Sequence, residues 1–212
     1  DSDLANLESL RERWPDKLSL LPLDVTSEAD LDRLSEVTES LPGGFDLAIH
    51  AAGILHEGDL QPEKALSQCK PEHLARLFEV NSIAPLMTAR ALLPNQPRKK
   101  RFAFVALSAM VGSIGDNRLG GWYGYRASKS ALNQFVRTLS NECRISHPRA
   151  VITAMHPGTT DTGLSQPFQQ NIEPERLYTA EQTATRLVGV VAQLESADSG
   201  QFFNWDGSRI PW

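Results

Sequence analysis

Short apolar runs rich in β-branched and aromatic residues alternate with segments of helical periodicity, and this alternation constrains the fold more than any other feature. We expect strands at residues 17–25, 45–53, 101–109, 150–158 and 200–207. We expect helices at residues 4–10, 24–41, 71–93, 123–146 and 179–194, the second of them capped by Thr26 or Ser27. Strands separated by crossover helices predict a doubly wound parallel sheet, an α/β fold with helices on both faces.

Three segments lack a clear period. Residues 55–70 are polar and predict a surface excursion, whereas residues 110–122 carry four glycines and predict an active-site loop. Residues 159–178 predict a mobile loop that would shape a substrate pocket. Because no linker or internal repeat interrupts the chain, we expect residues 1–212 to form a single domain.

Composition excludes several classes of function. With 41% hydrophobic residues in 212, the chain can bury a sizeable core. The 21 Lys+Arg against 26 Asp+Glu, a net charge of −5, argue against a broad nucleic-acid-binding surface. No apolar run approaches the roughly 20 residues that span a bilayer. Cys69 and Cys143 form no metal-spaced pair, so we expect free thiols, a cytoplasmic protein and no metal site.

The strongest chemical motif is YRASK, in which Tyr125 and Lys129 are four residues apart at the start of an expected helix. That spacing puts both side chains on one helix face. An adjacent ammonium favours the phenolate form of Tyr125. Acid/base catalysis near neutral pH requires the pKa of the tyrosine to fall by about three units, which corresponds to about 4 kcal/mol. Tyr123 is a rival proton donor, but it does not share a face with Lys129. We therefore expect Tyr125 to be the acid/base and Tyr123 and Trp122 to be pocket walls.

Ser108 strengthens this interpretation, since the Y-x-x-x-K pattern alone is weak. It ends the expected strand 101–109, at the sheet edge where ligands bind in open parallel sheets. Its hydroxyl could donate to a substrate carbonyl while Tyr125 supplies or removes a proton. A serine after a strand is also a common turn former, so it is the combination of Ser108, Tyr125 and Lys129 that indicates catalysis.

The segment LSAMVGSIGDNRLGGWYGYRASKSALNQF, which contains these residues, resembles the active-site region of the short-chain dehydrogenase/reductase family. The resemblance is greatest to the branch of the bacterial C-factor proteins and the sniffer-type carbonyl reductases. Further motifs follow in order: LDVT at residues 23–26, HAAG at 50–53, NSIAP at 81–85, HPGTTDT at 156–162 and the ending FFNWDGSRIPW. The resemblance implies a Rossmann-like domain and hydride transfer between NADP(H), or else NAD(H), and a small carbonyl or alcohol substrate. It also implies a homodimer or homotetramer paired through the two long helices.

The family also implies a role for individual residues. Asn81 would hold a water that links Lys129 to solvent, and it joins Ser108, Tyr125 and Lys129 as a catalytic residue. Asp24 would lie beside the adenine, although it also suits a helix N-cap. The implied cofactor-binding residues are Asp24, Val25, Ala51, Ala52, Gly53, Tyr125, Lys129, Pro157, Gly158, Thr160 and Thr162. His50 and Ala51 replace two asparagines of the usual family motif, which weakens any expectation of side-chain bonding there.

One family feature is absent from the sequence. Nothing matches the glycine-rich turn T-G-x-x-x-G-x-G that cradles the cofactor's pyrophosphate, and the first glycines are Gly43 and Gly44. We therefore expect a partial domain that lacks an N-terminal βαβ unit, either because that unit precedes Asp1 or because the protein has none. In the second case another subunit would have to cover the exposed sheet edge. On this ground the chain by itself could be catalytically silent.

Two other functions are compatible with parts of this sequence. A binding or cell-signalling protein that kept the fold and gave up turnover is the alternative, although the four intact catalytic residues argue against it. A serine hydrolase is disfavoured because the chain has no G-x-S-x-G motif and no histidine placed to activate Ser108.

Overall fold

Four parallel strands in the order β1-β2-β3-β6 form the central sheet of the computed structural model, which describes residues 2–212. They are β1 (Leu47–His50), β2 (Ala103–Leu107), β3 (Val151–His156) and β6 (Phe202–Asn204). Each strand runs parallel to its neighbour, with Ala103 paired to both Leu47 and Val151. All four lie within segments expected to be strands.

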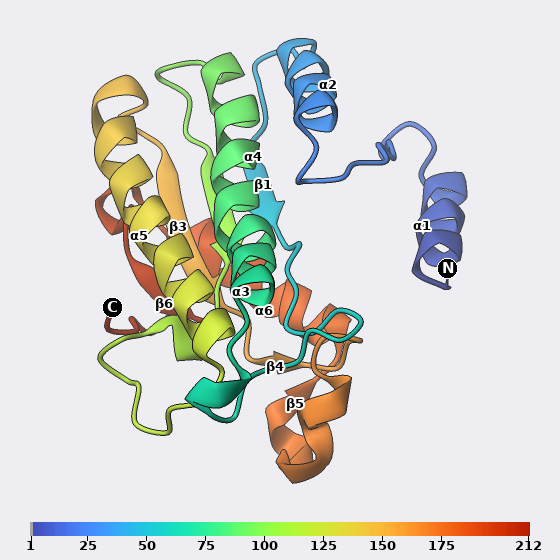
Figure 1. Cartoon of the computed structure of the whole chain (residues 1–212). Coiled ribbons are helices and arrows are strands. Elements are labelled where there is room, and N and C mark those ends of the chain that lie inside the picture. The colour runs from blue at the N-terminus through green and yellow to red at the C-terminus, as the bar shows by residue number, and fades with distance from the viewer. Residues whose placement is uncertain (1) are drawn as a thin grey trace.

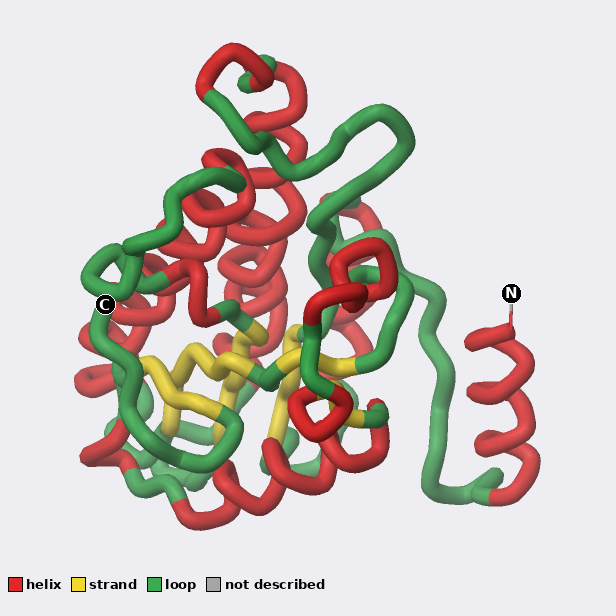
Figure 2. Tube along the Cα trace, turned by 90° about the horizontal axis from the view of Figure 1, so that it is seen from below, coloured by secondary structure: helices red, strands yellow, loops and turns green. Residues whose placement is uncertain are grey.

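The helices are α1 (Ser2–Arg13), α2 (Glu28–Glu39), α3 (Pro71–Phe78), α4 (Ala84–Leu92), α5 (Tyr123–Ser146) and α6 (Ala180–Gln193). Helices α4 and α5 cover one face of the sheet, α6 covers the other, and α2 packs against α4 (Figures 1 and 2). The predicted doubly wound, three-layer fold is therefore confirmed.

The core consists of two apolar layers, one on each face of the sheet. Alternate residues of β2 enter different layers because successive side chains of a strand point to opposite faces. Phe104 packs with Leu132 and Val136 of α5, whereas Val105 packs with Leu187 of α6. The sheet is thus held rigidly between its helices, and its strand ends can position a site.

Helix α1 stands apart from the rest of the molecule in both views (Figures 1 and 2). Two of its apolar side chains are exposed, Leu7 at 44% and Leu10 at 45%. The helix itself was expected from the leucine spacing, and Ser27 is the N-cap of α2, its hydroxyl accepting from the amide of Asp30.

The expected strand at residues 17–25 is wrong, because residues 18–24 are irregular. A strand needs a neighbour to pair its backbone groups, and no strand lies on the outer side of β1 in residues 2–212. Pro22 also lacks a backbone N–H. Two apolar residues of the segment, Leu23 and Val25, instead line a small cavity beside α2 and β1.

The expected helix at residues 71–93 is interrupted. A π-helical turn, Glu79–Ile83, separates α3 from α4, and a 3-10 turn, Leu93–Asn95, ends the run. Pro85 accounts for the break, because it has no N–H for the carbonyl of Asn81 four residues earlier. Widened turns of this kind are frequent at functional sites, and this one carries Asn81.

Two of the irregular segments are more ordered than expected. In residues 55–70, Leu55, Leu60 and Glu63 are buried, so the predicted surface excursion is wrong for these positions. Residues 159–178 are not a featureless loop: β4 (Thr159–Thr160) pairs with β5 (Leu177–Tyr178), and 3-10 turns at Gln166–Asn171 and Pro174–Arg176 lie between them. Short non-local pairings of this kind leave no periodic signal in a sequence.

Candidate active site

The carboxyl ends of β1, β2 and β3 meet at one edge of the sheet, where a cavity of about 790 Å³ opens. Loops from all three strand ends reach it, as do the first turns of α5 and α6. In open parallel sheets this edge is the usual ligand site. The predicted residues that line it are Ala51, Gly53, Ser108, Tyr125, Lys129, Pro157, Gly158, Thr160 and Thr162.

Tyr125 and Lys129 lie together on the first turns of α5, both buried. The Lys129 ammonium lies 5.8 Å from the centre of the Tyr125 ring, and its Nζ donates to the carbonyl oxygen of Leu107 at 2.9 Å. Burial raises the pKa of Tyr125 to about 12 and lowers the pKa of Lys129 to about 8. Burial is the cause of both shifts, and Tyr125 is a protonated phenol at neutral pH.

Ser108 follows β2 directly and is buried. Its hydroxyl donates to Oδ1 of Asn133 on α5 at 2.7 Å, while Nδ2 of Asn133 donates to the carbonyl of Gly112 at 3.2 Å. Asn133 thus orients the hydroxyl of Ser108, which lines the same cavity as Tyr125. The sequence did not single out Asn133, although a polar residue one turn beyond Lys129 on the same buried helix face is a usable signal.

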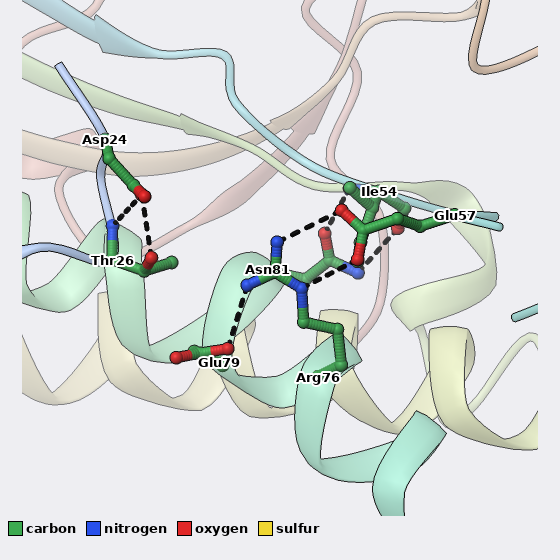
Figure 3. Close-up of polar contacts among 7 residues, drawn as sticks. All are labelled: Asp24, Thr26, Ile54, Glu57, Arg76, Glu79 and Asn81. Atoms are coloured by element: carbon green, nitrogen blue, oxygen red, sulfur yellow. Dashed lines mark hydrogen bonds and ion pairs between the residues drawn. The ribbon is translucent and has the colours of Figure 1, made fainter.

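Asn81 lies outside the cavity lining but touches its edge from the π-helical turn. Its side chain makes a pair of hydrogen bonds with the backbone of Ile54, Oδ1 accepting and Nδ2 donating, both at 2.8 Å (Figure 3). Nδ2 also donates to the Ser128 hydroxyl at 3.2 Å. A Cβ on Gly53 would lie 3.1 Å from Asn81 Oδ1 and 3.4 Å from Lys129 Nζ, so glycine keeps open the space between these two groups.

An ion-pair cluster holds the same loop at a second point. The Arg76 guanidinium binds both carboxylate oxygens of Glu57, at 2.9 and 3.0 Å, and also reaches Glu79 at 2.9 Å (Figure 3). Hydrogen bonding to Arg76 lowers the pKa of Glu57. Bidentate pairs fix orientation well, so the loop after β1 is fastened to α3 and to the π-helical turn.

The turn after β3 has its own support. Gly158 has φ of 78°, and a Cβ there would lie 3.1 Å from the Trp205 ring and 3.3 Å from the Tyr178 ring. The Arg186 guanidinium stacks over both rings, 3.9 Å from the centre of Tyr178 and 4.6 Å from that of Trp205. The backbone of this turn is therefore held close against aromatic side chains.

The remaining predicted residues lie elsewhere. Val25 and Ala52, together with Ala51, line a smaller cavity of about 180 Å³ beside β1. Asp24 lines neither cavity; its carboxylate accepts from the Thr26 amide at 2.9 Å and the Thr26 hydroxyl at 2.7 Å, which lowers its pKa (Figure 3). The expected helix N-cap role is wrong for Asp24, because Ser27 is the N-cap of α2 and Asp24 instead closes a turn before the helix. The adenine role stays a prediction.

The outer wall of the main cavity is apolar, formed by Leu55, Val111, Trp122, Leu164 and Phe168. Trp122 packs edge-on against Phe168 with ring centres 5.2 Å apart. The prediction that Trp122 is a wall is confirmed, whereas Tyr123 is 45% exposed and does not line the cavity. Residue 123 points away because it lies on a different helix face from Tyr125.

His156 is a further lining residue that the sequence did not identify as functional. It ends β3 beside Ser108, whose amide bonds to the preceding carbonyl of Met155 at 2.8 Å. Burial lowers the pKa of His156 to about 4, so the ring is neutral at physiological pH. The signal was its position directly before Pro157 and Gly158.

Neither a metal-binding cluster nor a membrane-spanning helix occurs in the part of the chain that the structure describes. Among residues 2–212, no three His, Cys, Asp or Glu side chains gather so that they could hold a metal ion. In that same part of the chain no helix has the length and apolar character needed to cross a bilayer.

The sequence matches proteins of a known family, in agreement with the arrangement of Ser108, Tyr125 and Lys129 around the cavity. Residues 2–173 match the model of the short chain dehydrogenase family. The chain is 32% identical over 151 residues to the C-signal protein of Myxococcus xanthus, covering 70% of this chain and 84% of that one. The chain belongs to the short chain dehydrogenase family, a class of oxidoreductases.

Solved structures agree. The NADPH-bound carbonyl reductase from chicken fatty liver superposes with a TM-score of 0.84 at 28% identity, over 98% of this chain and 82% of that one. The carbonyl reductase Sniffer of D. melanogaster gives 0.83 over 98% and 83%, and at 24% identity this likeness concerns the fold. The predicted resemblance to the C-factor and sniffer branch is confirmed.

Proposed function

We propose that this protein is an NAD(P)(H)-dependent oxidoreductase that interconverts a carbonyl and an alcohol, with Tyr125 as the acid/base. The observation that carries the proposal is the convergence of Tyr125, Lys129 and Ser108 on one cavity at the carboxyl edge of the sheet. A phenol, a cation and a hydroxyl around one space are what proton transfer to a carbonyl oxygen requires.

The residues at this edge fit the nicotinamide half of the cofactor. Gly53 leaves room between Asn81 and Lys129, and Gly158 brings backbone close to the cavity. The nicotinamide would supply or receive the hydride. NADP(H) is preferred over NAD(H) because the chicken carbonyl reductase holds NADPH. No glycine-rich turn for the pyrophosphate occurs in the sequence, so the fit concerns the nicotinamide half only.

For reduction, Tyr125 donates its phenolic proton to the forming alkoxide. Its pKa of about 12 keeps it in the donating form at neutral pH. Lys129, with a pKa of about 8, can return a proton near neutrality, and Asn81 would hold the water that connects it to solvent. Ser108 turns its hydroxyl from Asn133 toward the substrate oxygen and polarises it.

The cavity indicates an apolar substrate. Its outer wall of Leu55, Val111, Trp122, Leu164 and Phe168 carries no charge, and the charged group among the lining residues is Lys129. An uncharged ketone or aldehyde with an aromatic or branched aliphatic group would fill this space by burial of its apolar surface.

The signalling alternative rests on one observation, the 32% identity to the C-signal protein. A protein that only binds would not need Asn81, Ser108, Tyr125 and Lys129 together. We therefore place enzymatic turnover first and treat binding without turnover as the outcome that would replace it.

We further propose that residues 1–212 form a single domain that pairs as a homodimer or homotetramer through α3–α4 and α5. Ile83, in the π-helical turn between α3 and α4, is 46% exposed, and Ile145 on α5 is 77% exposed. Sedimentation of the protein would give a dimer or tetramer mass, and a monomer at micromolar concentration would contradict the proposal.

The experiment on function follows the nicotinamide absorbance while the protein is offered NADPH or NADH with a set of neutral aromatic and aliphatic ketones. Lys129→Met should reduce turnover at least about 100-fold, because the residue supplies a buried cation beside the acid/base. Lys64→Met, at an exposed position, is the matched control. Tight cofactor binding without turnover of any carbonyl or alcohol would instead favour the signalling role.

A further inference from the structure

Glu63 is a buried carboxylate that the proposed chemistry does not use. Its side chain is 3% exposed, in a segment that the sequence presents as polar and superficial. Burying a carboxylate is unfavourable unless polar groups compensate it. Its surroundings therefore indicate what it does.

The hydrogen bonds of Glu63 are all with the start of α5. Its Oε2 accepts from the amide of Gly124 at 3.1 Å, and its backbone carbonyl accepts from the amide of Trp122. Oε1 has no hydrogen-bond partner among the residues that the structure describes. The first amides of a helix have no partner within the helix, and a side-chain oxygen ordinarily satisfies them.

Helix α5 lacks such a cap of its own. Trp122 occupies the N-cap position, and its side chain makes no capping hydrogen bond. It also has φ of 51°, in the left-handed region that a bulky residue rarely adopts. Gly120 and Gly121, both with φ of 66°, lead the chain into this conformation. A strained backbone conformation of this kind persists where the surrounding structure enforces it. Here the Glu63 backbone carbonyl and the Glu63 carboxylate both bond to this turn.

The neighbouring glycine makes room for the carboxylate. A Cβ on Gly124 would lie 2.6 Å from Leu77, 2.8 Å from Leu74 and 3.0 Å from Glu63 Oε1. Glycine at this position thus lets the first turn of α5 approach both α3 and Glu63 closely.

The next residue along the helix is Tyr125. Its ring packs edge-on against Trp122, with centres 6.2 Å apart, and Trp122 is also the cavity wall. The orientations of the Tyr125 and Trp122 rings both depend on the turn that Glu63 holds. We infer that Glu63 is a positioning residue for Tyr125, taking the place of the missing N-cap and fixing the turn from which the phenol enters the cavity. The inference rests on the proposed function of Tyr125.

The test compares Glu63→Leu with Glu63→Gln. Both remove the charge, but only the glutamine keeps an oxygen that can accept from Gly124. Glu72→Leu, an exposed change on α3, is the control. Measured for each are kcat, the cofactor Kd, and hydrogen exchange of the amides at the start and in the middle of α5.

We expect Glu63→Leu to lower kcat at least about tenfold, since small displacements of reacting groups are costly to catalysis, while the cofactor Kd stays within about twofold. Exchange at Gly124 and Tyr125 should rise by about tenfold or more without a change at Val136. Glu63→Gln should stay within about threefold of the wild type in both readouts. Should the leucine variant not fold, Glu63→Ala gives the same measurements.

Two results would overturn the inference: kcat and exchange in Glu63→Leu that match those of Glu72→Leu, or kcat and cofactor affinity that fall together. Failure of the proposed function is recognised separately, as an absence of turnover by the wild-type protein. In that case the exchange measurement still decides whether Glu63 holds the turn.

Discussion

Burial acts on the two central side chains in the same sense, favouring the neutral form of each. It raises the pKa of Tyr125 to about 12 and lowers that of Lys129 to about 8. A phenol with a raised pKa is protonated at neutral pH, so Tyr125 holds the proton that reduction of a carbonyl requires. Oxidation of an alcohol would need the phenolate, and a bound nicotinamide's positive charge would act in that direction.

A second prediction for a single residue concerns Ser108. Replacing it with alanine removes the hydroxyl that would polarise the substrate oxygen, so we expect Ser108→Ala to lower kcat by about 10²-fold to 10³-fold, as for a lost oxyanion donor. Binding of cofactor should change little. Steady-state kinetics and a cofactor titration check this, with Ser130→Ala, on the same helix as Lys129, as the control. A kcat within threefold of wild type would exclude the role.

At the scale of elements, the π-helical turn at Glu79–Ile83 determines where Asn81 lies. In an unbroken α-helix the side-chain direction at this position would differ. The widened turn aims Asn81 at Ile54, and the loop after β1 is thereby attached to the helix. Arg76 and Glu57 attach the same loop farther along (Figure 3).

Asn81→Ala should accordingly destabilise the protein. Its three hydrogen bonds are to Ile54, twice, and Ser128, and the site is fully buried. Each buried partner left unsatisfied costs about 1–3 kcal/mol, so we expect a loss of about 3 kcal/mol or more in the free energy of unfolding. Urea denaturation measures it, with Asn95→Ala as a part-buried comparison. A loss below about 1 kcal/mol would mean that the loop is held mainly by other contacts.

The sequence predicted those elements whose signal is local. Helix α5 spans Tyr123–Ser146 as expected, because its apolar period is long and regular. Residues 17–25 do not form a strand because a strand needs a neighbour to pair with, and among residues 2–212 no strand is placed beside this segment. Glu63 and Asn133 were missed because each acts through contacts with a distant segment: Glu63 bonds the start of α5, and Asn133 accepts from Ser108.

For the whole molecule, histidine burial links stability to pH. Burial lowers the pKa of His50 and of His156 to about 4, from 6.5 in the unfolded chain. As pH falls between these values, the unfolded chain binds protons that the folded protein does not, so stability is lost. Each histidine can contribute up to about 3 kcal/mol to the difference in the free energy of unfolding between neutral and acidic pH.

We therefore predict that the free energy of unfolding decreases by several kcal/mol, at most about 6, between pH 7 and pH 4. Replacing His156 with glutamine should remove about half of this dependence, whereas His56→Gln, at a partly exposed position in the loop after β1, should not. Urea denaturation across this range is the measurement. An unchanged slope in His156→Gln would contradict the assignment of this pH dependence to buried neutral histidines.

The central claim is that Tyr125 is the acid/base of a nicotinamide-linked oxidoreductase. The most direct measurement compares the rate of carbonyl reduction by wild-type protein, Tyr125→Phe and Tyr123→Phe, with cofactor binding measured in parallel. We expect Tyr125→Phe to bind cofactor normally but to lose at least about 10²-fold in kcat, while Tyr123→Phe keeps wild-type activity. Activity of Tyr125→Phe near the wild-type level would contradict it.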